Sequence, residues 1–123
     1  MKKVLILASG NGSNAENISK FLNKTDSENE IKVLCNVKNA GVFKKMTNLK
    51  IPCILIEIGN KMSLIKECQN FKPDLIILAG YLKKIPTELI EIFKKKIINI
   101  HPSLLPKYGG KGMYGDNVHN QVL

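Results

Sequence analysis

Two residues near the end of the sequence, Asn99 and His101, have types and spacing suited to acyl transfer. They follow an apolar run that begins at Ile97, and Pro102 comes directly after them. Side chains alternate along a strand, so an amide and an imidazole two positions apart lie on the same side. The amide can stabilise an oxyanion while the imidazole moves a proton. The structural alternative is a buried strand end whose Asn and His are hydrogen-bonded within the fold.

A second candidate for ligand binding is the glycine-rich turn 10–15, which follows the apolar run 4–8 and precedes a helical pattern. Small residues let a ligand approach the backbone, and the free N–H groups of a helix N-terminus favour an anion. We therefore predict a phosphate or carboxylate site here. Ser13 and Asn14 are also residue types that cap helices, and capping alone is the alternative.

The same turn fits the pattern G-x-G-x-x-A, which is typical of dinucleotide-binding folds. An NAD-dependent enzyme would need a carboxylate at the end of the second strand, to bind the ribose. The apolar part of that strand ends at Cys35, and the next residues are Asn36, Val37, Lys38 and Asn39, none of them acidic. The sequence therefore favours an anion site over a dinucleotide site.

Strand and helix patterns alternate along the whole chain, which predicts an α/β fold with a doubly wound, mostly parallel sheet. Strands are expected at 4–8, 31–36, 53–58, 75–79 and 97–100. Helices are expected after the glycine-rich turn, over 41–49 and 61–70, and from Thr87. Their predicted apolar faces contain Ile18, Phe21 and Leu22, then Val42, Met46 and Leu49, then Leu64, Ile65 and Cys68. Ligands of such sheets bind beyond the strand C-termini, where the loops 10–14, 80–85 and 99–107 should meet.

Composition narrows the function classes further. The formal charge is +9, but all the basic residues are lysines and they are spread along the chain. We therefore expect no nucleic-acid groove. No apolar segment reaches the roughly 18 residues of a membrane span, and the apolar N-terminal run is too short for a secretion signal. The three scattered cysteines are typical of reduced thiols. We expect one cytoplasmic domain, 1–123, without membrane or metal partners.

Three motifs resemble the folate-dependent phosphoribosylglycinamide (GAR) formyltransferase family of purine synthesis, namely Ser9–Asn14, Leu78–Leu82 and Asn99–Tyr108. The resemblance runs from Lys3 to Leu123. Methionyl-tRNA formyltransferases and formyltetrahydrofolate hydrolases share the His-Pro-Ser core of the third motif, whereas the first motif is typical of GAR formyltransferases. The resemblance implies a Rossmann-like formyltransferase fold and transfer of a formyl group from 10-formyltetrahydrofolate to the GAR amine. The alternatives are another folate-dependent formyltransferase or hydrolase, an NAD-dependent oxidoreductase, and a basic nucleic-acid-binding module.

The resemblance also implies roles for individual residues. Asn99 would bind the formyl oxygen as it becomes an oxyanion, and His101 would be the protonated acid. The GAR phosphate would be held by Gly12, Ser13 and Asn14. The 10-formyltetrahydrofolate site would be lined by Leu82, Lys83, Lys84, Ile85 and Asn99. No metal is implied.

The sequence departs from the family at several places. Lys83 stands where the family has an arginine, and the segment 59–62 lacks an arginine that the family has. The glycine-rich stretch 109–115 is either a mobile cover for the substrate or a surface turn. The family continues past Leu123, into a part that contains the aspartate that keeps the catalytic histidine protonated, and Asp116 is not assigned that role. We therefore expect a domain without its C-terminal part, with a phosphate site, little formyl transfer, and an uncovered sheet edge at 97–100 that favours self-association.

Overall fold

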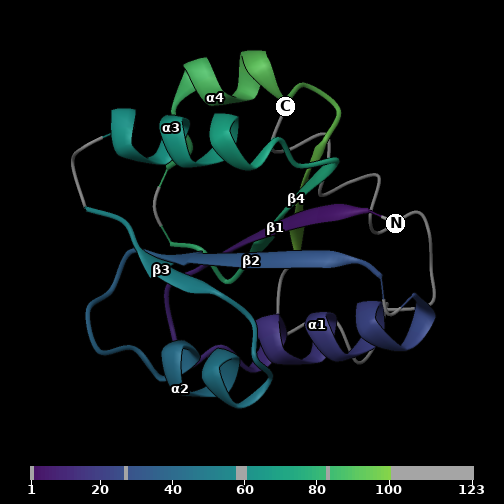
Figure 1. Ribbon diagram of the computed structural model, residues 1–123. Helices are drawn as coiled ribbons and strands as arrows, with labels where there is room; N and C mark the ends of the chain where they lie inside the picture. Colours follow the sequence, from purple (N-terminus) through teal and green to yellow (C-terminus); the bar gives the residue numbers. More distant parts are fainter. Residues whose placement is uncertain (1, 27, 58–60, 83, 101–123) are drawn as a thin grey trace.

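The computed structural model describes residues 2–26, 28–57, 61–82 and 84–100. Within these residues, strands and helices alternate as the sequence predicts (Figure 1). The strands are β1 (Lys3–Ala8), β2 (Glu30–Cys35), β3 (Cys53–Leu55), β4 (Leu75–Ala79) and β5 (Ile97–Ile100). The helices are α1 (Ser13–Thr25), α2 (Gly41–Asn48), α3 (Lys61–Phe71) and α4 (Thr87–Ile92).

The strands form one parallel sheet in the order β3-β2-β1-β4-β5. The chain first builds outward from β1 to β3 and then returns to place β4 on the other side of β1. The C-terminal ends of β1 and β4 therefore lie at the point where the strand order reverses, which is the usual ligand position in such sheets. The predicted α/β fold with a parallel sheet is confirmed.

Helices cover both faces of the sheet, with α3 and α4 on one face and α1 and α2 on the other (Figure 1). Side chains of β1 alternate between the two faces of the sheet. Leu5 and Leu7 pack with α3 and α4, whereas Val4 and Ile6 pack with α1 and α2. A strand buried on both faces requires an uninterrupted apolar run, and β1 has one.

Two details of the prediction are wrong. The third strand, predicted at 53–58, ends at Leu55, because its partner β2 ends at Cys35 and the N–H of Ile56 makes the last bond to that strand. Phe21 does not lie on the apolar face of α1, since its side chain is 64% exposed. The buried face of α1 uses Ala15 and Ser19 instead, one helical turn apart.

Among the described residues, no helix is both long and apolar enough to cross a membrane. The edge strands β3 and β5 each pair with one neighbour in this part of the chain. The predicted self-association through β5 stays a prediction.

Candidate functional site

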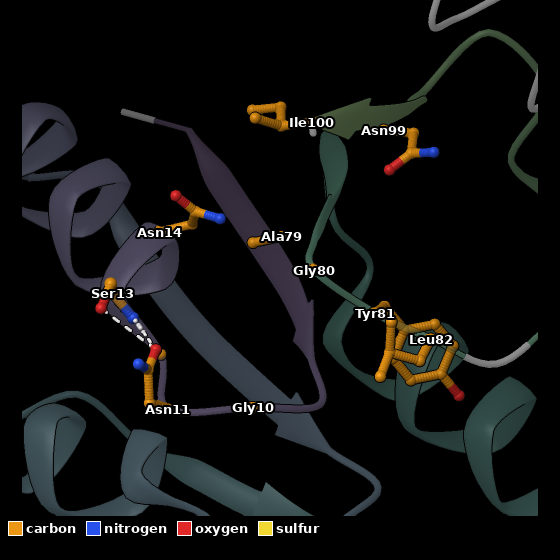
Figure 2. Close-up of a pocket in the computed structure, with 11 residues that line it drawn as sticks. Gly10, Asn11, Ser13, Asn14, Ala79, Gly80, Tyr81, Leu82, Asn99 and Ile100 are labelled. Atoms are coloured by element: carbon orange, nitrogen blue, oxygen red, sulfur yellow. Dashed lines mark hydrogen bonds between the residues drawn. The ribbon is translucent and has the colours of Figure 1, made fainter. Parts of the chain in front are cut away.

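A cavity of about 520 Å³ opens at the C-terminal ends of β1, β4 and β5. Three segments far apart in the sequence line it: the turn after β1, the loop after β4, and the last residues of β5 (Figure 2). Figure 2 shows Asn14 on one side and Asn99 on the other, with Ala79 and Gly80 between them. The expectation that Gly12 and Asn99 open onto the same sheet edge is confirmed.

The turn after β1 is shaped by Gly12, which is the N-terminal cap residue of α1 and has a left-handed backbone (φ 84°). A Cβ atom at this position would lie 2.6 Å from the Cα of Val42, so only glycine fits. The first intrahelical bond runs from the N–H of Glu16 to the carbonyl of Gly12. Helix geometry therefore leaves the N–H groups of Asn14 and Ala15 without intrahelical acceptors, at the start of a helix whose dipole favours anions.

Helix α2 supports this turn from behind. A Cβ atom at Gly41 would lie 3.2 Å from the Cα of Asn11, so the backbones of α2 and the turn are closely packed. The Lys45 ammonium also donates a hydrogen bond of 2.8 Å to the carbonyl oxygen of Asn11. The turn is therefore positioned by a second helix, which also brings a positive charge close to it.

Capping of α1 comes from Asn11 rather than from Ser13 or Asn14. The Asn11 Oδ1 accepts hydrogen bonds of 3.0 Å from both the backbone N–H and the hydroxyl of Ser13 (Figure 2). Asn14 lines the cavity, and no side-chain cap bond is made by the N-cap residue itself. The capping alternative for Ser13 and Asn14 is therefore wrong: Ser13 is the capped residue, and Asn14 is left facing the cavity.

The opposite wall is the Gly80–Leu82 loop, which leaves β4 through a left-handed residue at Gly80 (φ 75°). Burial raises the pKa of the Tyr81 phenol above its ordinary value of 10.0, so burial favours the neutral form of this group. Leu82 lines the cavity with a side chain that is 83% exposed. An exposed leucine beside a neutral phenol forms a wall suited to an apolar or aromatic ligand.

The other predicted residues of this loop are placed differently. Lys84 is exposed and is not among the described residues that line the cavity. Ile85 is buried in the apolar cluster beneath α3 and α4, so its side chain points away from the cavity. Lys83 lies outside the described residues.

Of the predicted catalytic pair, Asn99 lines the cavity and is partly buried at the end of β5. Its amide is therefore positioned where a donor could face a bound carbonyl group. His101 and the stretch 109–115 lie outside the described residues.

No role was predicted for Asn11, Tyr81 or Ser9. Asn11 could have been predicted from the sequence, because an Asn side chain commonly accepts a hydrogen bond from the backbone N–H two residues later. Tyr81 and Ser9 are identified only by packing and hydrogen bonds between distant segments. No group of three His, Cys, Asp or Glu residues able to hold a metal ion occurs in the described part of the chain.

The chain is similar in sequence to known formyltransferases over nearly its whole length. The family model described as formyl transferase matches residues 2–123. The chloroplastic phosphoribosylglycinamide formyltransferase of Vigna unguiculata is 39% identical over 130 residues, covering 99% of this chain and 42% of the relative. The phosphoribosylglycinamide formyltransferase of Haemophilus influenzae is 34% identical over 137 residues, covering 100% of this chain and 65% of the relative. The chain thus spans about half the length of these curated relatives.

Solved structures show the same likeness. Glycinamide ribonucleotide transformylase 1 from Geobacillus kaustophilus matches with a TM-score of 0.74 and 28% identity, over 95% of this chain and 66% of the other. Phosphoribosylglycinamide formyltransferase from Brucella melitensis matches with a TM-score of 0.75 and 26% identity, over 98% and 67%. Since the family model covers nearly all of the sequence, the chain belongs to the formyl transferase family.

Proposed function

We propose that this chain binds phosphoribosylglycinamide and 10-formyltetrahydrofolate and contributes the reacting groups for transfer of the formyl group to the glycinamide amine. In this proposal residues 1–123 act as one catalytic domain. The observation that carries the proposal is the single cavity that brings an anion-binding turn, an apolar loop and the Asn99 amide together. Family membership favours this function over the NAD-dependent oxidoreductase and the nucleic-acid-binding module.

The phosphate of the first substrate is proposed to bind at Gly12, Ser13 and Asn14. Support comes from the helix geometry, which leaves backbone N–H groups of the first turn of α1 free to donate. The Lys45 ammonium, bonded to the Asn11 carbonyl, adds a favourable positive charge nearby. A phosphate held there would place the rest of its substrate along the cavity toward Asn99.

The folate co-substrate is proposed to bind along the loop after β4. Leu82 is the described side chain that best supports this, since it lines the cavity and is almost fully exposed. Lys83 and Lys84 are proposed to attract the negatively charged tail of the folate. Ile85 would contribute through its backbone, because its side chain is buried in the core.

The proposed reaction forms a bond between the substrate amine and the formyl carbon, and it breaks the bond between that carbon and the folate nitrogen. The folate nitrogen takes up the proton that the amine loses. Asn99 donates a hydrogen bond to the formyl oxygen while that oxygen carries negative charge. His101, as the protonated imidazole, stabilises the same charge and assists the proton transfer. The chemistry proceeds between an amine and an electrophilic carbon, so the proposal includes no metal.

We also propose a cytoplasmic location. The described cysteines Cys35, Cys53 and Cys68 are free thiols, as is usual in a reducing compartment.

Binding tests the substrate assignment. The chain is titrated with GAR, NAD and single-stranded DNA at moderate salt, and GAR should bind most tightly. Tighter binding of NAD than of GAR would overturn the proposal.

Formyl transfer tests the chemistry. With the chain in excess over 10-formyltetrahydrofolate, release of tetrahydrofolate should require GAR, and Asn99→Ala should slow it by about 100-fold or more, as expected for loss of an oxyanion donor. Asn70→Ala, on the exposed surface of α3, is the matched control and should leave the rate unchanged. Release of formate without GAR would instead identify a hydrolase.

A further inference from the structure

Two buried polar side chains lie at the C-terminal ends of two neighbouring strands, the sheet edge onto which the cavity opens. Ser9 follows β1 and Asn36 follows β2, and each is 5% exposed. The Ser9 hydroxyl donates a hydrogen bond to Oδ1 of Asn36. The same hydroxyl accepts a hydrogen bond of 3.0 Å from the backbone N–H of Leu82, 73 positions away in the sequence. One hydroxyl therefore joins the ends of β1 and β2 to the loop after β4.

Ser9 is not among the described residues that line the cavity, so it is not proposed to touch a ligand. It immediately precedes Gly10, which begins one wall, and it bonds Leu82, which belongs to the other. The relative position of the two walls thus depends on this residue. Asn36 fixes the direction of the Ser9 O–H bond and so leaves an oxygen lone pair available to the Leu82 N–H.

The two walls depend on Ser9 to different degrees. The turn is also held by the Asn11 cap, by close packing against Val42 and by the Lys45 hydrogen bond. In the Gly80–Leu82 loop, Tyr81 packs against the core, and the hydrogen bond described for Leu82 is the one to Ser9. Loss of the hydroxyl should therefore release Leu82 while the turn keeps its shape.

We propose that Ser9 and Asn36 are positioning residues that hold the Leu82 wall at the distance from the turn that a folate ligand requires. This inference rests on the proposed function, because it assigns the Leu82 wall to the folate. It adds a pair of residues that act on the folate half of the site and leave the phosphate half unchanged.

The test is Ser9→Ala, measured with two probes and one spectroscopic readout. Affinity for 5-formyltetrahydrofolate should fall about fivefold to tenfold, the effect of one lost hydrogen bond. Affinity for inorganic phosphate should change less than twofold. Amide hydrogen exchange at Leu82 should become faster, because its acceptor is gone. Ser9→Thr, which keeps the hydroxyl, should restore both the folate affinity and the protection of this amide.

Ser19→Ala is the matched control, since Ser19 is also a buried serine whose hydroxyl contacts another helix, at Sδ of Met46 in α2. It lies away from the cavity, so both affinities and Leu82 exchange should be unchanged. Asn36→Ala should weaken folate binding less than Ser9→Ala does, because the hydroxyl remains. It serves as the second test if Ser9→Ala does not fold.

If the unaltered chain binds 5-formyltetrahydrofolate and Ser9→Ala leaves that affinity unchanged, or lowers both affinities equally, the positioning role is overturned while the proposed function stands. If the unaltered chain does not bind 5-formyltetrahydrofolate, the proposed function fails and this inference fails with it.

Discussion

The turn at 10–14 and the loop at 80–82 face each other across one cavity but are held in place in different ways. Asn11 caps the turn, α2 packs closely behind Gly12, and Lys45 bonds its backbone. The loop is less closely packed. A Cβ atom at Gly80 would meet nothing within 4 Å, and the Leu82 side chain is 83% exposed. The turn is held at several points, whereas the exposed end of the loop, at Leu82, is held by one described hydrogen bond, the one to Ser9.

The difference matches the two kinds of ligand proposed for the site. A phosphate is small and is recognised by N–H groups at fixed distances and angles, so its wall gains from being rigid before binding. A folate is large and flat, and an exposed apolar loop can adapt to its ring system. If this contrast holds, substitutions in the turn should cost more stability than substitutions in the loop.

Gly12→Ala should have the largest effect. The new methyl group would meet the backbone of Val42 at 2.6 Å, and the residue would keep a positive φ. Overpacking and a left-handed alanine together should lower the free energy of unfolding by about 2–5 kcal/mol. Urea denaturation measures this, and phosphate affinity should fall in parallel. Gly10→Ala is the control, because a Cβ atom there meets nothing within 4 Å. Equal urea midpoints for the two variants would show that the turn is not rigid.

Gly80→Ala separates the backbone strain from the packing clash. Gly80 also has a positive φ, of 75°, but no atom lies within 4 Å of the added methyl group. The free energy of unfolding should therefore fall by only about 1–2 kcal/mol, the cost of a left-handed L-residue. A loss as large as that of Gly12→Ala in the same urea experiment would mean that the two walls are equally constrained.

Asn11→Asp should change stability and binding in opposite directions. The carboxylate can still accept the Ser13 N–H bond, and a negative charge at the start of α1 should stabilise the helix by about 0.3–1 kcal/mol. The same charge should weaken phosphate binding about fivefold or more at low ionic strength. Both effects should shrink at about 1 M salt, where charges are screened. Stronger phosphate binding by this variant would contradict an anion site at the turn.

Tyr81→Phe should have the smallest effect on the free energy of unfolding, and the effect should be detectable only at alkaline pH. Burial raises the pKa of Tyr81 above its ordinary value of 10.0. As the pH rises above 10, the phenol therefore ionises in the unfolded state before it ionises in the folded state. The stability contributed in this way is complete below pH 10 and is lost as the pH rises through the folded pKa. The urea midpoint of the unaltered chain should therefore decline more steeply above pH 10 than that of the variant. Cys53 and Cys68, whose pKa values burial raises to about 12, are present in both proteins. Identical declines would show that the phenol is not buried.

Much of the fold could be predicted because its signals are local. The strands at 75–79 and 97–100 are found where the apolar runs predict them, and Leu64, Ile65 and Cys68 are buried as their helical spacing indicates. The third strand was predicted too long because its end is set by the length of its neighbour β2, which no local pattern encodes.

The site was predictable where a motif is continuous in the sequence and less so where it depends on contacts. Gly12, Asn14 and Asn99 line the cavity as expected. Ile85 was expected to line the folate site, but its side chain is buried, since the apolar cluster beneath α4 extends to this loop position. The role of Ser9 could not be foreseen, because its partners Asn36 and Leu82 become neighbours only when three strands are aligned.

The strand order also has a consequence for folding kinetics. Strand β1 is at the centre of the sheet, but its partner β4 begins at Leu75, and the Asn99 amide lies one strand further on. Parallel pairing across such sequence separations closes long loops before it gains contacts, so it is slow. The helix α1 and its glycine-rich turn can begin to form early from local contacts, whereas the second half of the cavity must wait until β4 and β5 have docked. In a refolding experiment, the ability to bind phosphate should therefore appear before the ability to bind a folate.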